Sequence, residues 1–185
     1  TDIAGYWCED YINFVTQREI FLGITSTTFG PNETLTRAMF VTVLGRLYER
    51  SYGEIRDSQD HRFADCDYDS YYGKYVDWAT SFGIIQGYGD GQFGPGDAIT
   101  REQMVTIVYN FAKAINKVPS YMDTTLNYPD SGSISGWAFD GAIFCQTENL
   151  FTVKEDGSFA PKEKATRADT AAILARLIQY VLRKK

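Results

Sequence analysis

The chain has 185 residues and a formal net charge of −6. That acidic balance argues against nucleic acid or an anionic membrane surface as a general partner. The length suffices for a sizeable core, and no apolar run approaches the roughly 20 residues of a membrane span. No signal peptide opens the chain, which starts at Thr1 and Asp2 inside what reads as a repeated unit. We therefore expect a piece of a larger protein.

Metal and cofactor signatures are weak. The three cysteines, Cys8, Cys66 and Cys145, form no CxxC pair, and His61 is the one histidine. Asp-Gly pairs are present, but too few oxygen ligands are spaced around them for calcium. We expect no metal and no cofactor, and we expect Cys8 and Cys145 to be packed residues.

One pattern recurs three times along the chain. Thr-Arg pairs end at Arg37, Arg101 and Arg167, which are 64 and 66 residues apart. Each arginine follows a phenylalanine by eight residues and a proline by six. Near-equal spacing indicates an internal repeat within one pseudo-symmetric domain. We name the units repeat 1 (residues 1–50), repeat 2 (63–114) and repeat 3 (128–182).

A first helix is expected at the start of each repeat. An aromatic residue stands 30 positions before each arginine, at Trp7, Tyr71 and Trp137. Positions four, seven and eight later are mostly apolar or small, the spacing of one helical face. We expect the three aromatic side chains to pack in the core rather than to contact carbohydrate.

Helix ends and turns follow. The first helices should end near Glu19, Gly83 and Asn149. Gly and Asn accept a left-handed C-terminal cap, so the helices of repeats 2 and 3 should end cleanly, while repeat 1 has Glu19 where a glycine is expected. Asp-Gly pairs at 90–91 and 156–157 then predict tight turns.

A second helix should begin at each Thr-Arg pair. Thr36, Thr100 and Thr166 are candidate N-caps, since a Thr hydroxyl can accept from free N–H groups of the first turn. The residues 3, 6, 7 and 10 positions after each arginine form one helical face, since their mutual offsets are 0, 3, 4 and 7. They are Phe40, Val43, Leu44, Leu47; Met104, Ile107, Val108, Phe111; and Thr170, Ile173, Leu174, Leu177.

Taken in this order, the features resemble a tandem of three S-layer homology (SLH) modules covering nearly the whole chain. Repeat 2 carries the resemblance best, in Phe63-Ala64-Asp65, in the segment 83–95 and in Ile99-Thr100-Arg101-Glu102. The resemblance implies an all-α fold. In it three modules form a pseudo-threefold helical bundle, a three-prong spindle, with grooves between neighbouring modules.

The resemblance also implies a function. SLH triplets are non-enzymatic and anchor a larger surface protein, outside the cell, to the bacterial cell wall. They bind secondary cell-wall polysaccharide, typically one with a pyruvylated sugar such as N-acetylmannosamine; modified peptidoglycan is the other candidate. A structural self-assembly module of an S-layer is the alternative. No catalytic motif or paired carboxylate stands out in the sequence.

The repeated arginines are the main candidates for ligand contact. An arginine in the first turn of a helix, beside partly capped N–H groups, makes a local anion site, and guanidinium fits a carboxylate bidentately. Pairing with Asp65 or Asp130, which would tie the modules together, is the other reading. The glycine turn of repeat 2 could approach a sugar closely, or could serve turn geometry alone. The candidate ligand-binding residues are Arg37, Arg101, Arg167, Asp65, Asp130, Gly87, Tyr88 and Gly89.

The three sites should be unequal. The acidic residue that the family usually carries two places after the arginine is Met39 in repeat 1 and Gln103 in repeat 2, and only Asp169 keeps it. Repeat 2 alone keeps nearly the full glycine turn before its Thr-Arg pair. We therefore expect the best site at Arg101.

Overall fold

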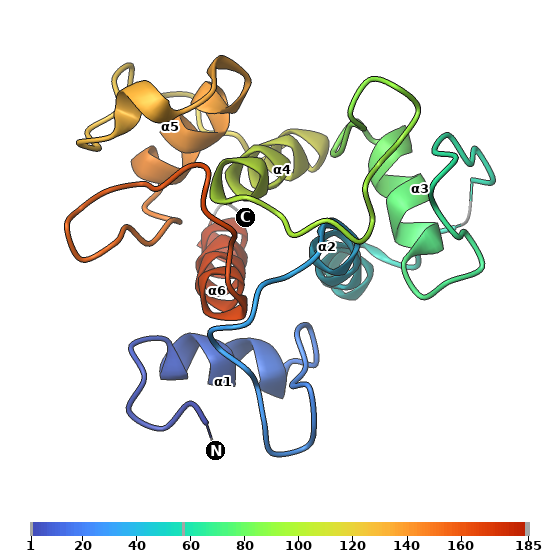
Figure 1. Ribbon diagram of the computed structural model, residues 1–185, viewed down its shortest axis with the longest axis horizontal. Helices are drawn as coiled ribbons and strands as arrows, with labels where there is room; N and C mark the ends of the chain where they lie inside the picture. The colour runs from blue at the N-terminus through green and yellow to red at the C-terminus, as the bar shows by residue number, and fades with distance from the viewer. Residues whose placement is uncertain (1, 57, 184–185) are drawn as a thin grey trace.

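The computed structural model describes residues 2–56 and 58–183, and within them the fold is all-α. Three long helices form the centre in Figure 1: α2 (Arg37–Tyr52), α4 (Arg101–Ala114) and α6 (Arg167–Arg183). Three short helices lie outside them: α1 (Glu9–Gln17), α3 (Gly73–Ser81) and α5 (Phe139–Thr147), the last preceded by the 3-10 turns η1 (Ser131–Ser133) and η2 (Gly136–Ala138). This arrangement confirms the predicted pseudo-threefold bundle. No helix in the described ranges is long and apolar enough to cross a membrane.

The outer helices pack on the inner helix of a different repeat. Helix α3 lies against α2, α5 against α4, and α1 against α6. Each repeat thus covers its predecessor, and repeat 1 covers repeat 3. We call these contacts the 1–2, 2–3 and 3–1 interfaces. The ring closes because the first and last helices of the chain meet.

The ends of the outer helices follow the sequence prediction. Glu19, Gly83 and Asn149 all have positive φ, at 52°, 66° and 52°. An apolar residue follows each of them and is buried. A left-handed residue at this point turns the chain back so that the next side chain reaches the core.

The inner helices begin with the predicted threonine caps. The Thr36 hydroxyl accepts from the N–H of residue 39, and the Thr100 hydroxyl accepts from Gln103, whose side chain returns the bond in a capping box. Thr166 and Asp169 make the same reciprocal pair. Each cap satisfies an N–H that the helix itself leaves free.

A ring of backbone hydrogen bonds joins the three extended stretches before these helices. Ile99 N–H donates to the Leu35 carbonyl at 2.9 Å, Ala165 donates to Ile99 at 2.9 Å, and Leu35 donates to Ala165 at 3.3 Å. The three side chains are completely buried. This triangle fixes where the inner helices start relative to one another.

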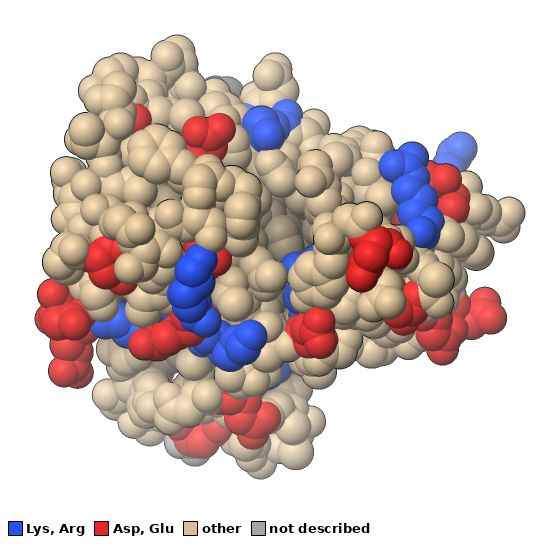
Figure 2. All heavy atoms as spheres, turned by 45° about the horizontal axis from the view of Figure 1, so that its top comes forward, with Lys and Arg blue, Asp and Glu red and all other residues tan. Residues whose placement is uncertain are grey.

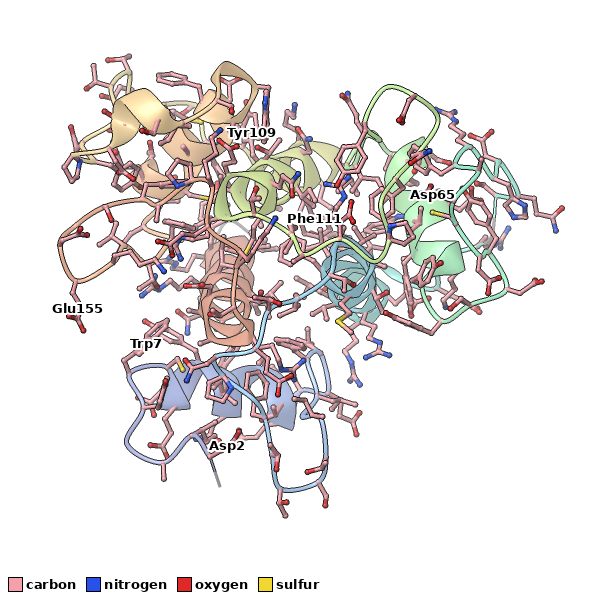
Figure 3. The ribbon with its side chains drawn as sticks, in the orientation of Figure 1. Asp2, Trp7, Asp65, Tyr109, Phe111 and Glu155 are labelled. Atoms are coloured by element: carbon pink, nitrogen blue, oxygen red, sulfur yellow. The ribbon has the colours of Figure 1, made fainter. Side chains whose placement is uncertain are left out.

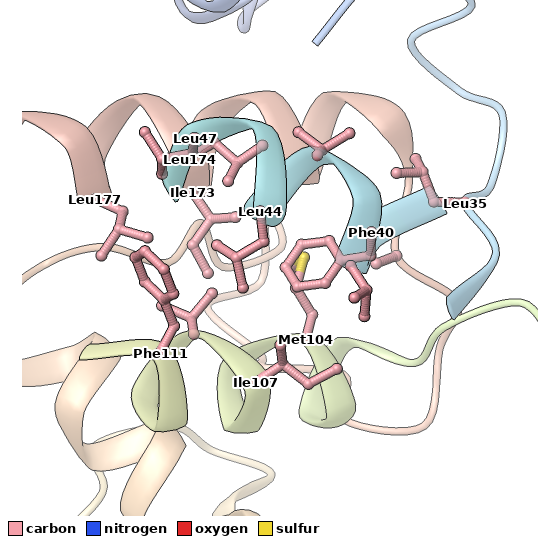
Figure 4. Close-up of a cluster of buried hydrophobic side chains, with 14 of the residues drawn as sticks. Leu35, Phe40, Leu44, Leu47, Met104, Ile107, Phe111, Ile173, Leu174 and Leu177 are labelled. Carbon is pink, nitrogen blue, oxygen red and sulfur yellow. The ribbon is translucent and has the colours of Figure 1, made fainter. Parts of the chain in front are cut away.

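The core lies between the inner helices (Figure 4). All twelve positions predicted for the second-helix faces are buried. Burial of each large apolar side chain contributes roughly 1.5–3 kcal/mol relative to exposure. All three repeats therefore contribute side chains to the core, and no single repeat contains a complete core of its own.

The expectation that Trp7, Tyr71 and Trp137 pack in the core is wrong. Their exposed fractions are 52%, 56% and 57%. All three precede the outer helices, which start at Glu9, Gly73 and Phe139, so the helical periodicity does not extend back to them. The three repeats instead present an aromatic ring to solvent at the same place.

All three cysteines are free thiols, and Cys8 and Cys145 are packed as predicted, with exposed fractions of 0% and 1%. Burial is the main cause that raises the pKa of Cys66 to about 11. These thiols are poor nucleophiles near neutral pH.

Candidate functional site

The three repeated arginines are buried, and each reaches into the next repeat of the ring. Their exposed fractions are 4% for Arg37, 0% for Arg101 and 9% for Arg167. In each case Nε donates to the carbonyl of the phenylalanine that precedes the turn proline of that repeat. The acceptors are Phe93 at 2.8 Å, Phe159 at 2.9 Å and Phe29 at 2.6 Å. The arginines therefore do tie the repeats together, but through backbone carbonyls.

Asp65 and Asp130 hold the same segments from within their own repeats. Each carboxylate accepts from two consecutive backbone N–H groups at 2.8 Å, those of the phenylalanine and of the residue after it. Asp2 makes the same pair of bonds in repeat 1, and they lower its pKa. None of the three carboxylates forms an ion pair with an arginine among the described residues. They position the carbonyl that receives the guanidinium.

A groove with a volume of about 620 Å³ lies at the 2–3 interface. Helix α4 forms its floor, the turn of repeat 2 one wall, and the start of α5 the other; in Figure 3, Tyr109 lies between α4 and α5. Figure 2 shows a hollow between the lobes that carry α5 and α3, and acidic and basic side chains are mixed over that face. The groove is lined by Arg37, residues 84–88, Gln103, Thr106, Ile107, Tyr109, Asn110, Lys113, Trp137, Asp140 and Gly141.

Arg37 supplies a cation to this groove. Its Nη2 donates to the carbonyl of Gln86 at 3.1 Å, and its Cζ lies 4.8 Å from the ring centre of Tyr88. Burial lowers the pKa of the Arg37 guanidinium. The nearby Tyr88, Asp97 and Asp65 act in the opposite direction and offset part of this shift. No carboxylate forms an ion pair with Arg37 in the part of the chain that the structure describes.

Arg101 shows what Arg37 lacks. Nη1 of Arg101 donates to Oδ1 of Asp169 at 2.8 Å, an ion pair in which the arginine side chain is 1% exposed and the aspartate 10%. The residue equivalent to Asp169 at the groove is Gln103. A neutral amide thus stands where the buried arginine has an acidic partner. The groove therefore offers a guanidinium to an anion from outside.

The groove brings together three of the eight candidate ligand residues, Arg37, Gly87 and Tyr88. The Tyr88 side chain is half-exposed, and its hydroxyl donates to Asp97 at 2.8 Å. A side chain at position 87 would clash, since a Cβ there would lie 2.3 Å from the Gln92 carbonyl oxygen.

The other five candidates lie elsewhere. Gly89 belongs to the same turn, with φ 94°, and is not among the lining residues. Asp65 and Asp130 hold the backbone as described. Arg167 binds the Phe29 carbonyl of repeat 1, and Arg101 is paired with Asp169 of α6. The turn of repeat 2 thus faces the arginine of repeat 1, and not the arginine that follows it in sequence.

Sequence reasoning missed several groove residues. Tyr109, Asn110 and Lys113 lie on the outer face of α4, and Trp137 and Asp140 come from the start of repeat 3. A signal was present, because position 109 is Tyr where the other inner helices have glycine and alanine. Comparison of the repeats at outward positions, rather than at buried ones, reveals this groove.

The fold defines a modular repeat protein, and the groove lies at the interface between two of its repeats. The S-layer homology domain family matches the chain at residues 1–39, 67–105 and 127–171. The chain belongs to the S-layer homology family, as its repeated motifs indicated.

Known relatives match over almost the whole chain. An endoglucanase of Bacillus sp. (strain KSM-635) is 31% identical over 95% of this chain and 18% of its own length. The cellulosome-anchoring protein of Acetivibrio thermocellus is 26% identical over 86% of the chain and 35% of its own length. An S-layer protein of Bacillus licheniformis is 23% identical over 93% of the chain and 19% of its own length. The chain thus spans about a third or less of these relatives, and the family agrees with the predicted cell-surface localisation.

Proposed function

We propose that this chain anchors a larger surface protein to the bacterial cell wall by binding secondary cell-wall polysaccharide in the 2–3 groove. The observation that carries the proposal is the Arg37 guanidinium, which faces the groove and forms no ion pair with a carboxylate among residues 2–56 and 58–183. The relatives support it, since one is a cellulosome-anchoring protein and others are S-layer proteins.

The anion that fits is the carboxylate of a ketal-linked pyruvate. Arg101 and Asp169 give an internal example, in which Nη1 and a carboxylate oxygen lie 2.8 Å apart. A pyruvyl carboxylate at the equivalent place would meet Nη1 of Arg37. Charge-assisted bonds of this kind are about twice as strong as neutral ones, and partial burial strengthens them further.

The walls of the groove suit a sugar. Trp137 and Tyr88 are 57% and 50% exposed, so both rings have faces free for stacking on a pyranose. Lys113 lies at the far end of the α4 face, with Nζ 4.7 Å from the Tyr109 ring centre. From Gln103 to Lys113 the helix rises about 15 Å, so the floor is long enough for more than one sugar ring.

The role we propose is non-catalytic. The enzymes among the relatives match this chain over a minor share of their length, 18% for the endoglucanase and 9% for an amylopullulanase of Thermoanaerobacterium thermosulfurigenes. Fusion to a larger protein is part of the proposal. The limits of the three repeats, at 1–50, 63–114 and 128–182, stay a prediction.

Pull-down with purified wall polysaccharide tests the proposal. The chain should bind the native polymer and lose binding after mild acid removes the pyruvate. Arg37→Gln should weaken binding by roughly 10- to 100-fold, the effect of losing one charge-assisted hydrogen bond. Arg62→Gln, an exposed arginine paired with Asp60, is the matched control and should bind normally. Equal binding to the depyruvylated polymer would contradict the ligand assignment.

A further inference from the structure

One position of the outer helices differs between the three interfaces. Tyr11 in α1, Tyr75 in α3 and Gly141 in α5 are equivalent, each four residues after the exposed aromatic of its repeat. Each belongs to an outer helix that packs on the inner helix of the preceding repeat. The 2–3 groove is thus at the interface whose outer helix has no side chain at this position.

At the 3–1 interface, Tyr11 is fixed on α6 by Arg176. Nε and Nη2 of Arg176 donate to the Tyr11 hydroxyl at 3.2 and 2.9 Å, and Cζ lies 4.8 Å from the ring centre. The remaining nitrogen, Nη1, donates to Oγ1 of Thr152 at 2.9 Å. Since Thr152 is equivalent to Gln86, this bridge runs from the outer helix to the turn segment across the surface that matches the groove.

At the 1–2 interface, Tyr75 covers α2. Its side chain is buried and lies directly on Gly45, where an added Cβ would come within 2.2 Å of the ring. The Tyr75 hydroxyl donates to Glu49 at 2.9 Å, and Lys74 donates to the other oxygen of the same carboxylate at 2.8 Å. The ring and the ion pair together occupy the outer face of the inner helix.

At the 2–3 interface, the large and small residues change places. Gly141 lets α5 approach the α4 backbone, since a Cβ there would lie 2.8 Å from the Val105 carbonyl oxygen. The tyrosine is now Tyr109 on α4, at the position of Gly45, and its ring lies 5.6 Å from that of Phe144. No tyrosine of the outer helix crosses the groove. The counterpart of Arg176 is Asn110, which donates back to the Ile84 carbonyl at 3.2 Å.

We infer that the chain holds one glycan site, the 2–3 groove, and that Tyr11 and Tyr75 close the equivalent surfaces at the other two interfaces. The inference rests on the proposed function and adds the number of glycan sites per chain. A sugar at the 3–1 interface would have to break the bonds of Arg176, and Arg101 beneath it is already paired with Asp169. A sugar at the 1–2 interface would have to displace the buried Tyr75.

Titration calorimetry and tryptophan emission test the inference. The probe is the methyl glycoside of N-acetylmannosamine carrying a 4,6-linked pyruvate ketal. We expect one probe bound per chain. Trp7 and Trp137 stand at equivalent places beside the 3–1 and 2–3 interfaces, while Trp78 is buried in the core. The emission change should persist in Trp7→Phe and disappear in Trp137→Phe.

A third reporter covers the remaining interface. Tyr71→Trp in the Trp137→Phe background places a tryptophan beside the 1–2 interface, and its emission should not respond to the probe. Two or three probes per chain, or a response from Trp7 or from position 71, would overturn the inference and leave the proposed function standing. No heat with the probe and no retention by the pyruvylated polymer would overturn both.

Discussion

Arg37 and Arg101 occupy the same place in the repeated motif and have different surroundings. Both send Nε to a phenylalanine carbonyl, at 2.8 and 2.9 Å, and Nη2 to a second loop carbonyl, at 3.1 and 2.7 Å. Both lie over an aromatic ring, with Cζ 4.8 Å from the centre of Tyr88 and 4.4 Å from that of Phe151. Within the described part of the chain, Arg101 has a carboxylate on Nη1 and Arg37 has none.

One residue of the following repeat makes this difference. Asp169 caps the start of α6 with one oxygen and binds Arg101 with the other. Gln103 caps α4 in the same way and brings no charge to Arg37. The same scaffold thus yields an internal ion pair at one interface and, in our proposal, an anion site at another. Substitutions at Asp169 and Gln103, or at the arginines they face, should therefore make one interface behave like the other.

Removal of the buried pair should have the largest effect. Arg101→Leu leaves Asp169 buried without its cation and should lower the free energy of unfolding by about 3–5 kcal/mol, measured by urea denaturation. Arg37→Leu loses carbonyl bonds but strands no charge, so its cost should be clearly smaller. Arg101→Leu with Asp169→Asn should cost less than the two single changes added together. An equal cost for Arg37→Leu and Arg101→Leu would refute this account of the difference.

A carboxylate supplied to Arg37 should close the ligand site. Gln103→Asp places an acid where Asp169 stands beside Arg101, and it should weaken binding of the pyruvylated probe at least about tenfold, or about 1.4 kcal/mol. Calorimetry measures the loss. Met39→Asp makes the same charge change at the equivalent position facing Arg167, outside the groove, and should bind as the unaltered chain does. Equal weakening by both variants would indicate a general charge effect instead.

The sequence was sufficient for most of the fold. The spacing of the Thr-Arg pairs, the threonine caps and the periodic apolar positions are local signals, and the structure confirms them. The predicted aromatic packing failed because the outer helices begin two residues after Trp7, Tyr71 and Trp137.

The candidate site was harder to predict because its parts are distant in sequence. We expected the turn of repeat 2 to serve Arg101, which follows it directly. Instead, the Gln86 carbonyl in this turn accepts a hydrogen bond from Arg37, which lies 49 residues earlier in the sequence. The two residues meet because each inner helix begins against the neighbouring repeat. The ring closes through a contact between Arg167 and Phe29, 138 residues apart. Local sequence patterns do not indicate which distant segments meet to close the ring of repeats.

The helix starts offer a comparison of smaller size. Thr100→Ala breaks a complete capping box with Gln103 and should lower the free energy of unfolding by about 1 kcal/mol. Thr36→Ala removes a single bond, since Met39 has no group to return it, and its cost should lie nearer 0.5 kcal/mol. Urea denaturation of the two variants compares them. A larger loss for Thr36→Ala would show that α2 depends on its cap more than α4 does.

The smallest expected effect concerns how the stability depends on pH near the C-terminal ends of α2 and α4. Burial acts to raise the pKa of Glu49 on α2, but hydrogen bonds from Lys74 and Tyr75 prevail, and the net pKa is lowered from 4.5. A carboxyl whose folded pKa lies below its unfolded value stabilises the fold above the unfolded pKa, and this contribution is lost as pH falls through the folded pKa.

The equivalent residue on α4 is Lys113, so the 1–2 interface alone should feel this loss. Between pH 5 and pH 3, the urea midpoint of the unaltered chain should fall more steeply than that of Glu49→Gln, which lacks the titrating group. Glu155 projects from the turn of repeat 3 (Figure 3), and Glu155→Gln is the matched control. If Glu49→Gln and Glu155→Gln follow the same pH profile, the Tyr75 closure does not depend on an ionised Glu49.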